Sequence, residues 1–241
     1  DLGAYGLDIY GKSRFTELMK TLSSLDGDFV LRMLYIHPDT FPMDLIDLVS
    51  ENKKILPYFD IPVQHADEEV LRAMRRSGSG EKYGELFQKI REKNPDAVIR
   101  TTLMLGFPGE DRAAFEKLLE FVKNAEPDWM GSFTYSREED TPAYSMRNQK
   151  EHDKAQREAR KWQKELEEVQ SPITEKHLER FVGNTYRALV EEIIEGEELA
   201  IGRIYSQAPD VDGLCVIMGR DMKPGDTVMV GIRAVRGVDL E

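Results

Sequence analysis

The sequence predicts an α/β fold in which a partial (β/α) barrel is followed by a small all-β barrel. Short apolar segments alternate with amphipathic helical segments over the first 136 residues. Those apolar segments are too hydrophobic to face solvent on one side, which indicates a parallel sheet covered by helices. After residue 181 the helical spacing gives way to short strand-like segments with Gly and Asp turns, which is typical of a small, OB-like barrel. We therefore expect two domains, residues 1–180 and 181–241.

The first domain is expected to hold four strands joined by helices. Apolar runs predict strands at residues 29–36, 57–63, 97–105 and 128–136. Apolar residues recur at helical spacing in residues 42–52, 67–76, 81–93 and 111–124. Asp67 is a plausible N-cap of its helix. Because such crossovers are right-handed, the sheet is expected to curl toward a barrel.

A long charged segment follows the last of these strands. Residues 149–178 predict a helix that packs one stripe against the barrel and leaves the rest in solvent. A coiled-coil helix is the alternative interpretation. Pro172 lies inside the segment and is expected to kink or restart the helix.

Composition and charge exclude several classes of protein. The 241 residues contain no apolar run near the ~20 residues that span a bilayer. The net charge of −12 disfavours non-specific binding to nucleic acid. Cys215 is the single cysteine, which fits a reducing compartment, so we expect a cytoplasmic protein without disulfides. One thiolate cannot hold an iron–sulfur cluster. The opening DLGAYG reads as the middle of a loop, so we expect further sequence upstream.

Polar residues or glycines follow each predicted strand of the first domain. Ligands of parallel α/β folds bind at the carboxyl ends of the strands. Glycines allow a ligand to approach the backbone closely, and the helix after the third strand offers free N–H groups. An ordinary strand-to-helix turn, capped by Glu110 or Asp111, explains the same glycines. The strand ends are Tyr35 to Pro38, Gln64 and His65, Gly106 to Glu110, and Tyr135 to Arg137.

For several individual polar residues, the sequence allows both a functional and a structural interpretation. His65 fits a ligand contact or a structural hydrogen bond, and Arg32, inside an apolar strand, needs either a structural partner or an anionic group. The triplet Arg72, Arg75 and Arg76 reads as a solvated helix end or as a docking site for an acidic surface. The four histidines show no metal-binding spacing, so we expect no metal ligands in this chain.

Several motifs together resemble the radical S-adenosylmethionine (radical SAM) methylthiotransferases. The resemblance covers essentially the whole chain in order. It implies a radical SAM partial barrel over residues 1–180 and a TRAM domain over 181–241. The motifs are LRMLYIHPD (31–39), YFDIPVQHAD (58–67), VLRAMRR (70–76), RTTLMLGFPGE (100–110), FTYSREEDTPAYSM (133–146) and SQAPDVDG (206–213).

The resemblance also implies the cofactors and their contacts. S-adenosylmethionine and two [4Fe–4S] clusters are expected in a full-length protein, but the CxxxCxxC loop and an N-terminal domain are absent, so this chain can bind neither cluster. Asp111 stands where the family usually has Thr. The resemblance gives no catalytic residue. The expected contacts to S-adenosylmethionine are Arg32, Gln64, His65, Gly106, Phe107, Pro108, Gly109 and Tyr135.

The substrate is expected to be an aspartate of ribosomal protein uS12 on the small ribosomal subunit, methylthiolated at its β-carbon. The branch of the family that modifies adenosine-37 of tRNA usually has Pro-x-Gln-Ser-Gly-Ser where this chain has Pro62-Val-Gln-His65. Residues 181–241 carry six basic and eleven acidic side chains, a net charge of −5. That charge suits a basic protein better than RNA. The tRNA reaction and a cluster-less module that docks on the ribosome remain alternatives, and no membrane partner is expected.

Overall fold

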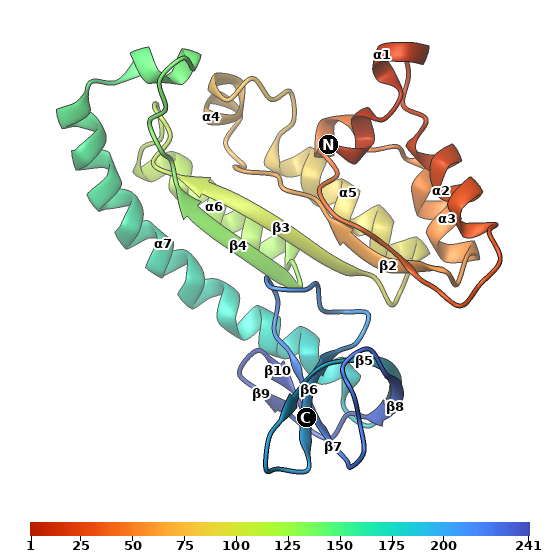
Figure 1. Ribbon diagram of the computed structural model, residues 1–241. Helices are drawn as coiled ribbons and strands as arrows, with labels where there is room; N and C mark the ends of the chain where they lie inside the picture. Colours follow the sequence, from red (N-terminus) through yellow and green to blue (C-terminus); the bar gives the residue numbers. More distant parts are fainter. The chain divides into compact units, whose positions relative to one another are not determined.

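The computed structural model describes residues 1–241. The chain forms two compact units, residues 1–170 and 171–241 (Figure 1). The boundary between the two domains that the sequence predicts, near residue 180, stays a prediction. No helix of the structure combines the length and the apolar character that crossing a membrane requires.

The larger unit contains a sheet of four parallel strands in the order β1-β2-β3-β4. Helices connect the strands, which is the arrangement that the alternating sequence pattern predicts. The strands are β1 (Leu31–Met33), β2 (Ile55–Asp60), β3 (Val98–Leu105) and β4 (Trp129–Thr134). The helices are α1 (Leu7–Tyr10), α2 (Phe15–Ser23), α3 (Asp44–Glu51), α4 (Glu68–Ala73), α5 (Gly80–Lys93) and α6 (Arg112–Ala125), with 3-10 turns η1 (Leu2–Ala4), η2 (Pro38–Thr40) and η3 (Pro142–Met146).

Strand β1 is shorter than residues 29–36, the range that the sequence predicts. The pairing with β2 is irregular between Leu31 and Met33, and Tyr35 then takes a left-handed backbone conformation at φ 65°. The Asp60 carboxylate accepts a hydrogen bond from the Tyr35 N–H at 2.9 Å. The side chain therefore replaces a sheet partner at this position and ends the strand.

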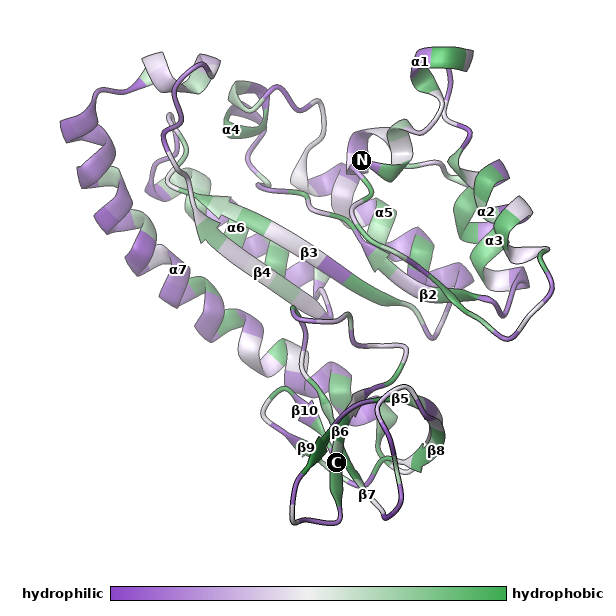
Figure 2. Cartoon of the chain, viewed as in Figure 1, coloured by the Kyte–Doolittle hydropathy of each residue, from purple (hydrophilic) through white to green (hydrophobic).

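Apolar side chains between the sheet and its helices form the core of this unit. Phe87 of α5 and Phe121 of α6 pack with ring centroids 6.0 Å apart. Phe59 of β2 is fully buried, with its ring centroid 6.3 Å from that of Phe41. Figure 2 shows hydrophobic residues along β3 and hydrophilic residues over most of the long helix α7 (Gln149–Leu178).

Helix α7 packs a narrow stripe, as the sequence predicts. Ala159 and Leu166 are fully buried, and Trp162 stacks on Phe115 of α6 at 5.2 Å between ring centroids. The helix continues through Pro172 without interruption, so the predicted restart is wrong. A proline inside a helix removes one backbone donor and crowds the carbonyl four residues before it, which can bend a helix without ending it. The predicted kink at Pro172 stays a prediction.

The smaller unit is a six-stranded sheet in the order β8-β5-β6-β7-β10-β9. Most pairs are antiparallel, as predicted, but β10 pairs with β7 in parallel. The aromatic rings of Phe181, Tyr186 and Tyr205 contact one another, and Phe181 is buried while both tyrosines are half-buried. The strands are β5 (Thr185–Ile194), β6 (Leu199–Arg203), β7 (Cys215–Met218), β8 (Thr227–Gly231), β9 (Val235–Arg236) and β10 (Asp239–Leu240), preceded by the 3-10 turn η4 (Glu179–Phe181).

Candidate functional site

A cavity of about 510 Å³ lies at the carboxyl ends of the parallel strands. Its lining is mostly apolar, with a few polar side chains, which is typical of a small-molecule site. The residues come from the ends of the strands, from the loop after α4 and from the segment after β4. They are Tyr35, Pro62, Gln64, Ala73, Met74, Arg75, Arg76, Thr102, Met104, Phe107, Phe133, Thr141, Pro142 and Ala143.

Gln64 combines an unusual backbone with an unpaired side-chain oxygen. Its φ is 70°, a conformation that costs free energy for a residue with a Cβ. Hydrogen bonds to β3 hold it there: the Gln64 N–H donates to Thr102 O at 2.9 Å, and the Met104 N–H donates to Gln64 O at 2.8 Å. The side chain is buried, and its Oε1 has no hydrogen-bond partner. Since a buried acceptor without a partner is unfavourable, this oxygen suits a ligand that donates a hydrogen bond.

Both glycines of the turn after β3 have a positive φ, and Gly106 also has a close neighbour that leaves no space for a side chain. Gly106 has φ 79°, and a Cβ there would lie 2.8 Å from the Cβ of Ala159. Gly109 has φ 96° with open space around it. Asp111 caps α6 by accepting from the Ala114 N–H at 2.9 Å, so Glu110 is free for another role.

Glu110 connects this turn to His65. One carboxylate oxygen accepts a hydrogen bond from the Gly106 N–H, and the other lies 3.3 Å from His65 Nε2. His65 Nδ1 accepts from the Asp67 N–H at 3.0 Å, so we assign the ring proton to Nε2, which donates to Glu110. Both side chains are fully buried. The structural interpretation of His65 is therefore the one that these contacts support.

Arg147, which lies between η3 and α7, contacts the same turn from outside the sheet. Its Nη1 donates to Gly106 O at 2.8 Å and its Nη2 to Phe107 O at 3.1 Å. Burial lowers the pKa of the Arg147 guanidinium, and the nearby charge of Glu110 opposes that change. The Phe107 ring packs edge-on against Tyr135 at 5.0 Å between centroids.

Arg75 and Arg76 reach the cavity because of how α4 ends. The Arg76 N–H donates to Leu71 O and the Arg75 N–H to Arg72 O, which is the Schellman pattern of a helix C-terminus. Arg75 occupies the left-handed position at φ 60°, where glycine is usual. Arg76 also donates to Pro62 O at 3.0 Å. Arg75 is exposed and Arg76 is half-buried, so the interpretation as a solvated helix end holds for Arg75. Both residues also line the cavity.

The residues that the sequence proposes for the site fall into three groups. Gln64 and Phe107 line the cavity. Gly106, Pro108, Gly109, His65 and Tyr135 belong to the turn or to the buried layer that supports it, and Tyr135 keeps its hydroxyl buried without a hydrogen-bond partner. Arg32 is half-buried in β1, with its guanidinium 4.5 Å from the centre of the Tyr58 ring.

The sequence interpretation missed several residues at the cavity. Met74, Thr141, Pro142, Ala143 and Arg147 line the cavity or contact its wall. Most lie in loops, whose path no spacing predicts. Tyr35, which the sequence identifies as the end of a strand, also lines the cavity.

A larger groove of about 1020 Å³ lies on the outer helices α4, α5 and α6. Its lining is strongly acidic and comes from helices and the loops beside them, with no residue of a strand. We place the candidate site in the smaller cavity, because strand ends and an unpaired buried polar atom occur there.

The side chains of this chain do not fit an iron–sulfur cluster. No group of three or more His, Cys, Asp or Glu side chains is arranged to hold a metal ion. Cys215 is buried in the smaller unit, and burial raises the pKa of its thiol to about 11. A thiol of that kind is a poor metal ligand.

Comparisons with known proteins agree with the two-part architecture. Residues 6–122 match the radical SAM superfamily, and residues 182–241 match the TRAM domain. A solved structure of coproporphyrinogen III oxidase (HemN) from Escherichia coli, a radical SAM enzyme, superposes with a TM-score of 0.52 at 15% identity over 80% of this chain and 48% of that chain. At that identity the likeness concerns the fold, and it confirms the predicted α/β class.

Curated relatives are similar over nearly the whole chain. The chain is 42% identical, over 93% of its length, to the ribosomal protein uS12 methylthiotransferase RimO of Treponema denticola, of which the match covers 51%. The protein of the same name from Alkaliphilus oremlandii is 38% identical over 100% of this chain and 54% of its own length. The chain therefore spans about half the length of the curated relatives it matches.

Proposed function

We propose that this chain is the S-adenosylmethionine-binding and TRAM portion of a uS12 methylthiotransferase. The chain belongs to the radical SAM superfamily and carries a TRAM domain. The observation that carries the proposal is the cavity at the ends of the strands, where the buried Gln64 Oε1 lacks a partner. The similarity to proteins named RimO supports the choice of reaction.

The cavity fits the nucleoside part of S-adenosylmethionine. Phe107, Met104 and Ala143 provide apolar walls, which suit a purine ring. Gln64 Oε1 would accept a hydrogen bond from the ligand, and Thr102 adds a polar side chain nearby. Five residues support the part of the lining that Phe107 forms: His65, Gly106, Pro108, Gly109 and Tyr135. Direct contact of these residues with the ligand stays a proposal. Direct contact of Arg32 with the ligand also stays a proposal.

When bound, S-adenosylmethionine would supply the radical chemistry that activates a C–H bond, and a second molecule of it would supply the transferred methyl group. The residues of this chain bind and orient the nucleoside and exclude water from it. Phe107 and the segment that contains Pro142 both line the cavity. The ligands of the iron–sulfur clusters are not among these residues, so the transfer of an electron to S-adenosylmethionine is not assigned to this chain.

The proposed substrate is the β-carbon of an aspartate in ribosomal protein uS12. The relatives' name supports that choice, and the net charge of −12 suits a basic protein partner in the cytoplasm. Methylthiolation of adenosine-37 in tRNA is the second candidate, because radical SAM and TRAM domains are compatible with it. A docking module without catalysis is the third.

A competition experiment decides among these functions. The full-length protein is reconstituted anaerobically with iron and sulfide, then offered a uS12 loop peptide and tRNA together with S-adenosylmethionine and a reductant. We expect a methylthio group on the peptide aspartate by mass spectrometry. Modification of the tRNA alone would support the second candidate, and an unmodified peptide and tRNA would support the third.

A further inference from the structure

Arg147 lies outside every strand end, yet it contacts the wall of the candidate site. It follows η3 and precedes α7. Its two terminal nitrogens donate to two successive carbonyl groups, Gly106 O at 2.8 Å and Phe107 O at 3.1 Å. A planar guanidinium spans two such acceptors at once, whereas the ammonium group of a lysine acts as a point donor.

The contacts of Arg147 complete the hydrogen bonding of the turn. Glu110 accepts from the Gly106 N–H, and the Glu110 N–H donates to Phe107 O at 3.0 Å. Arg147 supplies the donor for Gly106 O and a second donor for Phe107 O. Without it, Gly106 O would lose its donor in a buried place, and a buried carbonyl without a partner is unfavourable.

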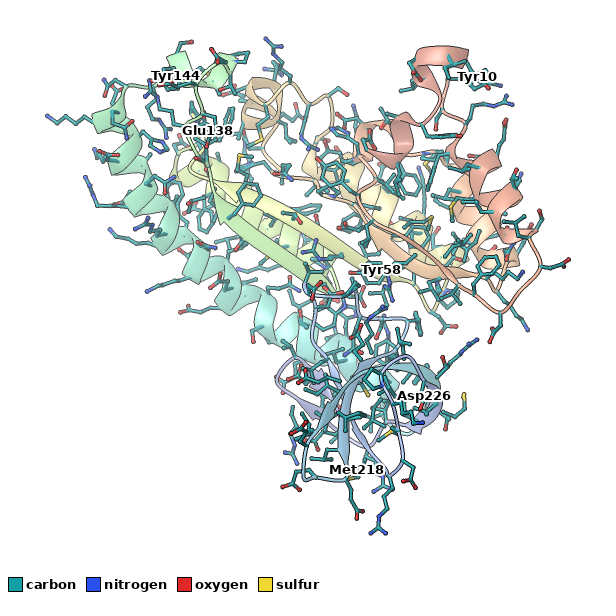
Figure 3. The ribbon with its side chains drawn as sticks, viewed as in Figure 1. Tyr10, Tyr58, Glu138, Tyr144, Met218 and Asp226 are labelled. Atoms are coloured by element: carbon teal, nitrogen blue, oxygen red, sulfur yellow. The ribbon has the colours of Figure 1, made fainter.

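Arg147 also follows the segment that supplies other residues of the cavity lining. Thr141, Pro142 and Ala143 line the cavity, and that segment is folded upon itself. Arg137 donates to Tyr144 O at 2.9 Å and lies 3.6 Å from the centre of the Tyr144 ring. Figure 3 labels Glu138 and Tyr144, which both belong to the stretch of chain between β4 and α7.

We propose that Arg147 is a positioning residue that fastens the Phe107 wall to the 141–146 segment, so that the cavity keeps the width a nucleoside needs. The inference rests on the proposed function for the identity of the ligand. Arg147 is not expected to touch the ligand, since it is not among the residues that line the cavity.

The test compares three variants of the 241-residue chain, with S-adenosylhomocysteine as the probe and calorimetry as the measurement. Arg147→Gln removes the double donor, and we expect its affinity to fall by roughly 10-fold or more. Arg147→Lys keeps the charge and should lie between it and the wild type. Arg112→Gln is the matched control, because Arg112 forms exposed ion pairs with Glu165 and Glu116, and it should bind like the wild type.

Amide hydrogen exchange gives a second reading that needs no ligand. In Arg147→Gln, the Gly106 and Glu110 amides should exchange at least 10-fold faster, while amides of β3 keep their rates. A purely structural loss would instead speed exchange throughout the unit. If Arg147→Gln does not fold, Arg147→Lys decides the question by the same two measurements.

The outcomes separate this inference from the proposed function. If the wild type binds the probe and the Arg147 variants bind it equally well, the inference is overturned and the proposed function stands. If the wild type does not bind the probe, the proposed function fails, and the ligand part of the inference fails with it. Unchanged exchange at Gly106 and Glu110 would overturn the role of Arg147 in the turn, whatever the probe does.

Discussion

At the scale of single residues, Gln64 carries the strongest sign of a binding site. Its backbone is left-handed and its buried Oε1 lacks a partner, and both features oppose folding. Such unfavourable features persist where surrounding structure holds them, and they are typical of functional sites. The sequence identified Gln64 because it follows a strand. It could not show the backbone conformation, which depends on pairing with β3.

Replacement of Gln64 by leucine separates binding from stability. In Gln64→Leu we expect the affinity for S-adenosylhomocysteine to fall about 5- to 20-fold, because one hydrogen bond to the ligand is lost. The free energy of unfolding should stay within about 0.5 kcal/mol of wild type or rise, since no existing bond of Oε1 is broken. Calorimetry and urea denaturation measure the two quantities. Gln88→Leu on the surface of α5 is the control, and a large loss of stability in Gln64→Leu would contradict this account.

The two glycines of the turn should differ in their tolerance of a side chain. Gly106→Ala places a Cβ 2.8 Å from Ala159 and at φ 79°, so we expect a loss of about 2–4 kcal/mol in the free energy of unfolding. Gly109→Ala meets open space and should lose only about 1–2 kcal/mol from its positive φ. Fluorescence of Trp129 and Trp162 during urea denaturation reports both. Equal losses would show that Ala159 does not constrain the turn.

At the scale of elements, the sequence predicts the order of strands and helices well because hydrophobic periodicity is local. It does not predict where β1 ends, because the Asp60 carboxylate, distant in sequence, takes the Tyr35 N–H. The C-terminus of α4 was missed for a related reason. Arg75 occupies a left-handed position where glycine is usual. Without a glycine there, nothing in the sequence predicts that the loop turns toward the cavity.

Asp39 joins two elements and should make the larger unit sensitive to acid. Burial pushes the pKa of Asp39 upward, but hydrogen bonds from Ser77 and Tyr83 outweigh it and hold the pKa below its ordinary value of 3.8. The stabilisation is therefore present above pH 3.8 and lost as the pH falls through the lowered pKa. Asp39→Asn should reduce the free energy of unfolding by about 1–2 kcal/mol at pH 7.

The difference between Asp39→Asn and the wild type should shrink as the pH falls below 3.8. Urea denaturation followed by tryptophan fluorescence, from pH 2 to pH 7, measures it. Asp26→Asn, at an exposed position, is a surface control for the general effect of losing a carboxylate. A difference that stays constant down to pH 2 would mean that the Asp39 carboxylate does not provide the stabilisation.

At the scale of the whole molecule, the charge distribution favours a basic partner. The chain carries −12 overall, and residues 181–241 carry −5. Attraction between such a surface and a basic peptide weakens as salt screens it. In the full-length protein, we expect the KM for a uS12 loop peptide to rise about 3- to 10-fold between 50 and 300 mM salt, with kcat nearly unchanged. A KM that is indifferent to salt would contradict the electrostatic part of the account.

A crystal structure of this chain with S-adenosylhomocysteine would decide whether the cavity at the strand ends binds the nucleoside of S-adenosylmethionine. We expect density for the adenosine against Phe107 and Met104, with a ligand donor within hydrogen-bonding distance of Gln64 Oε1. Density in the acidic groove between α4, α5 and α6, or an empty cavity at a ligand concentration that calorimetry shows to be saturating, would contradict it.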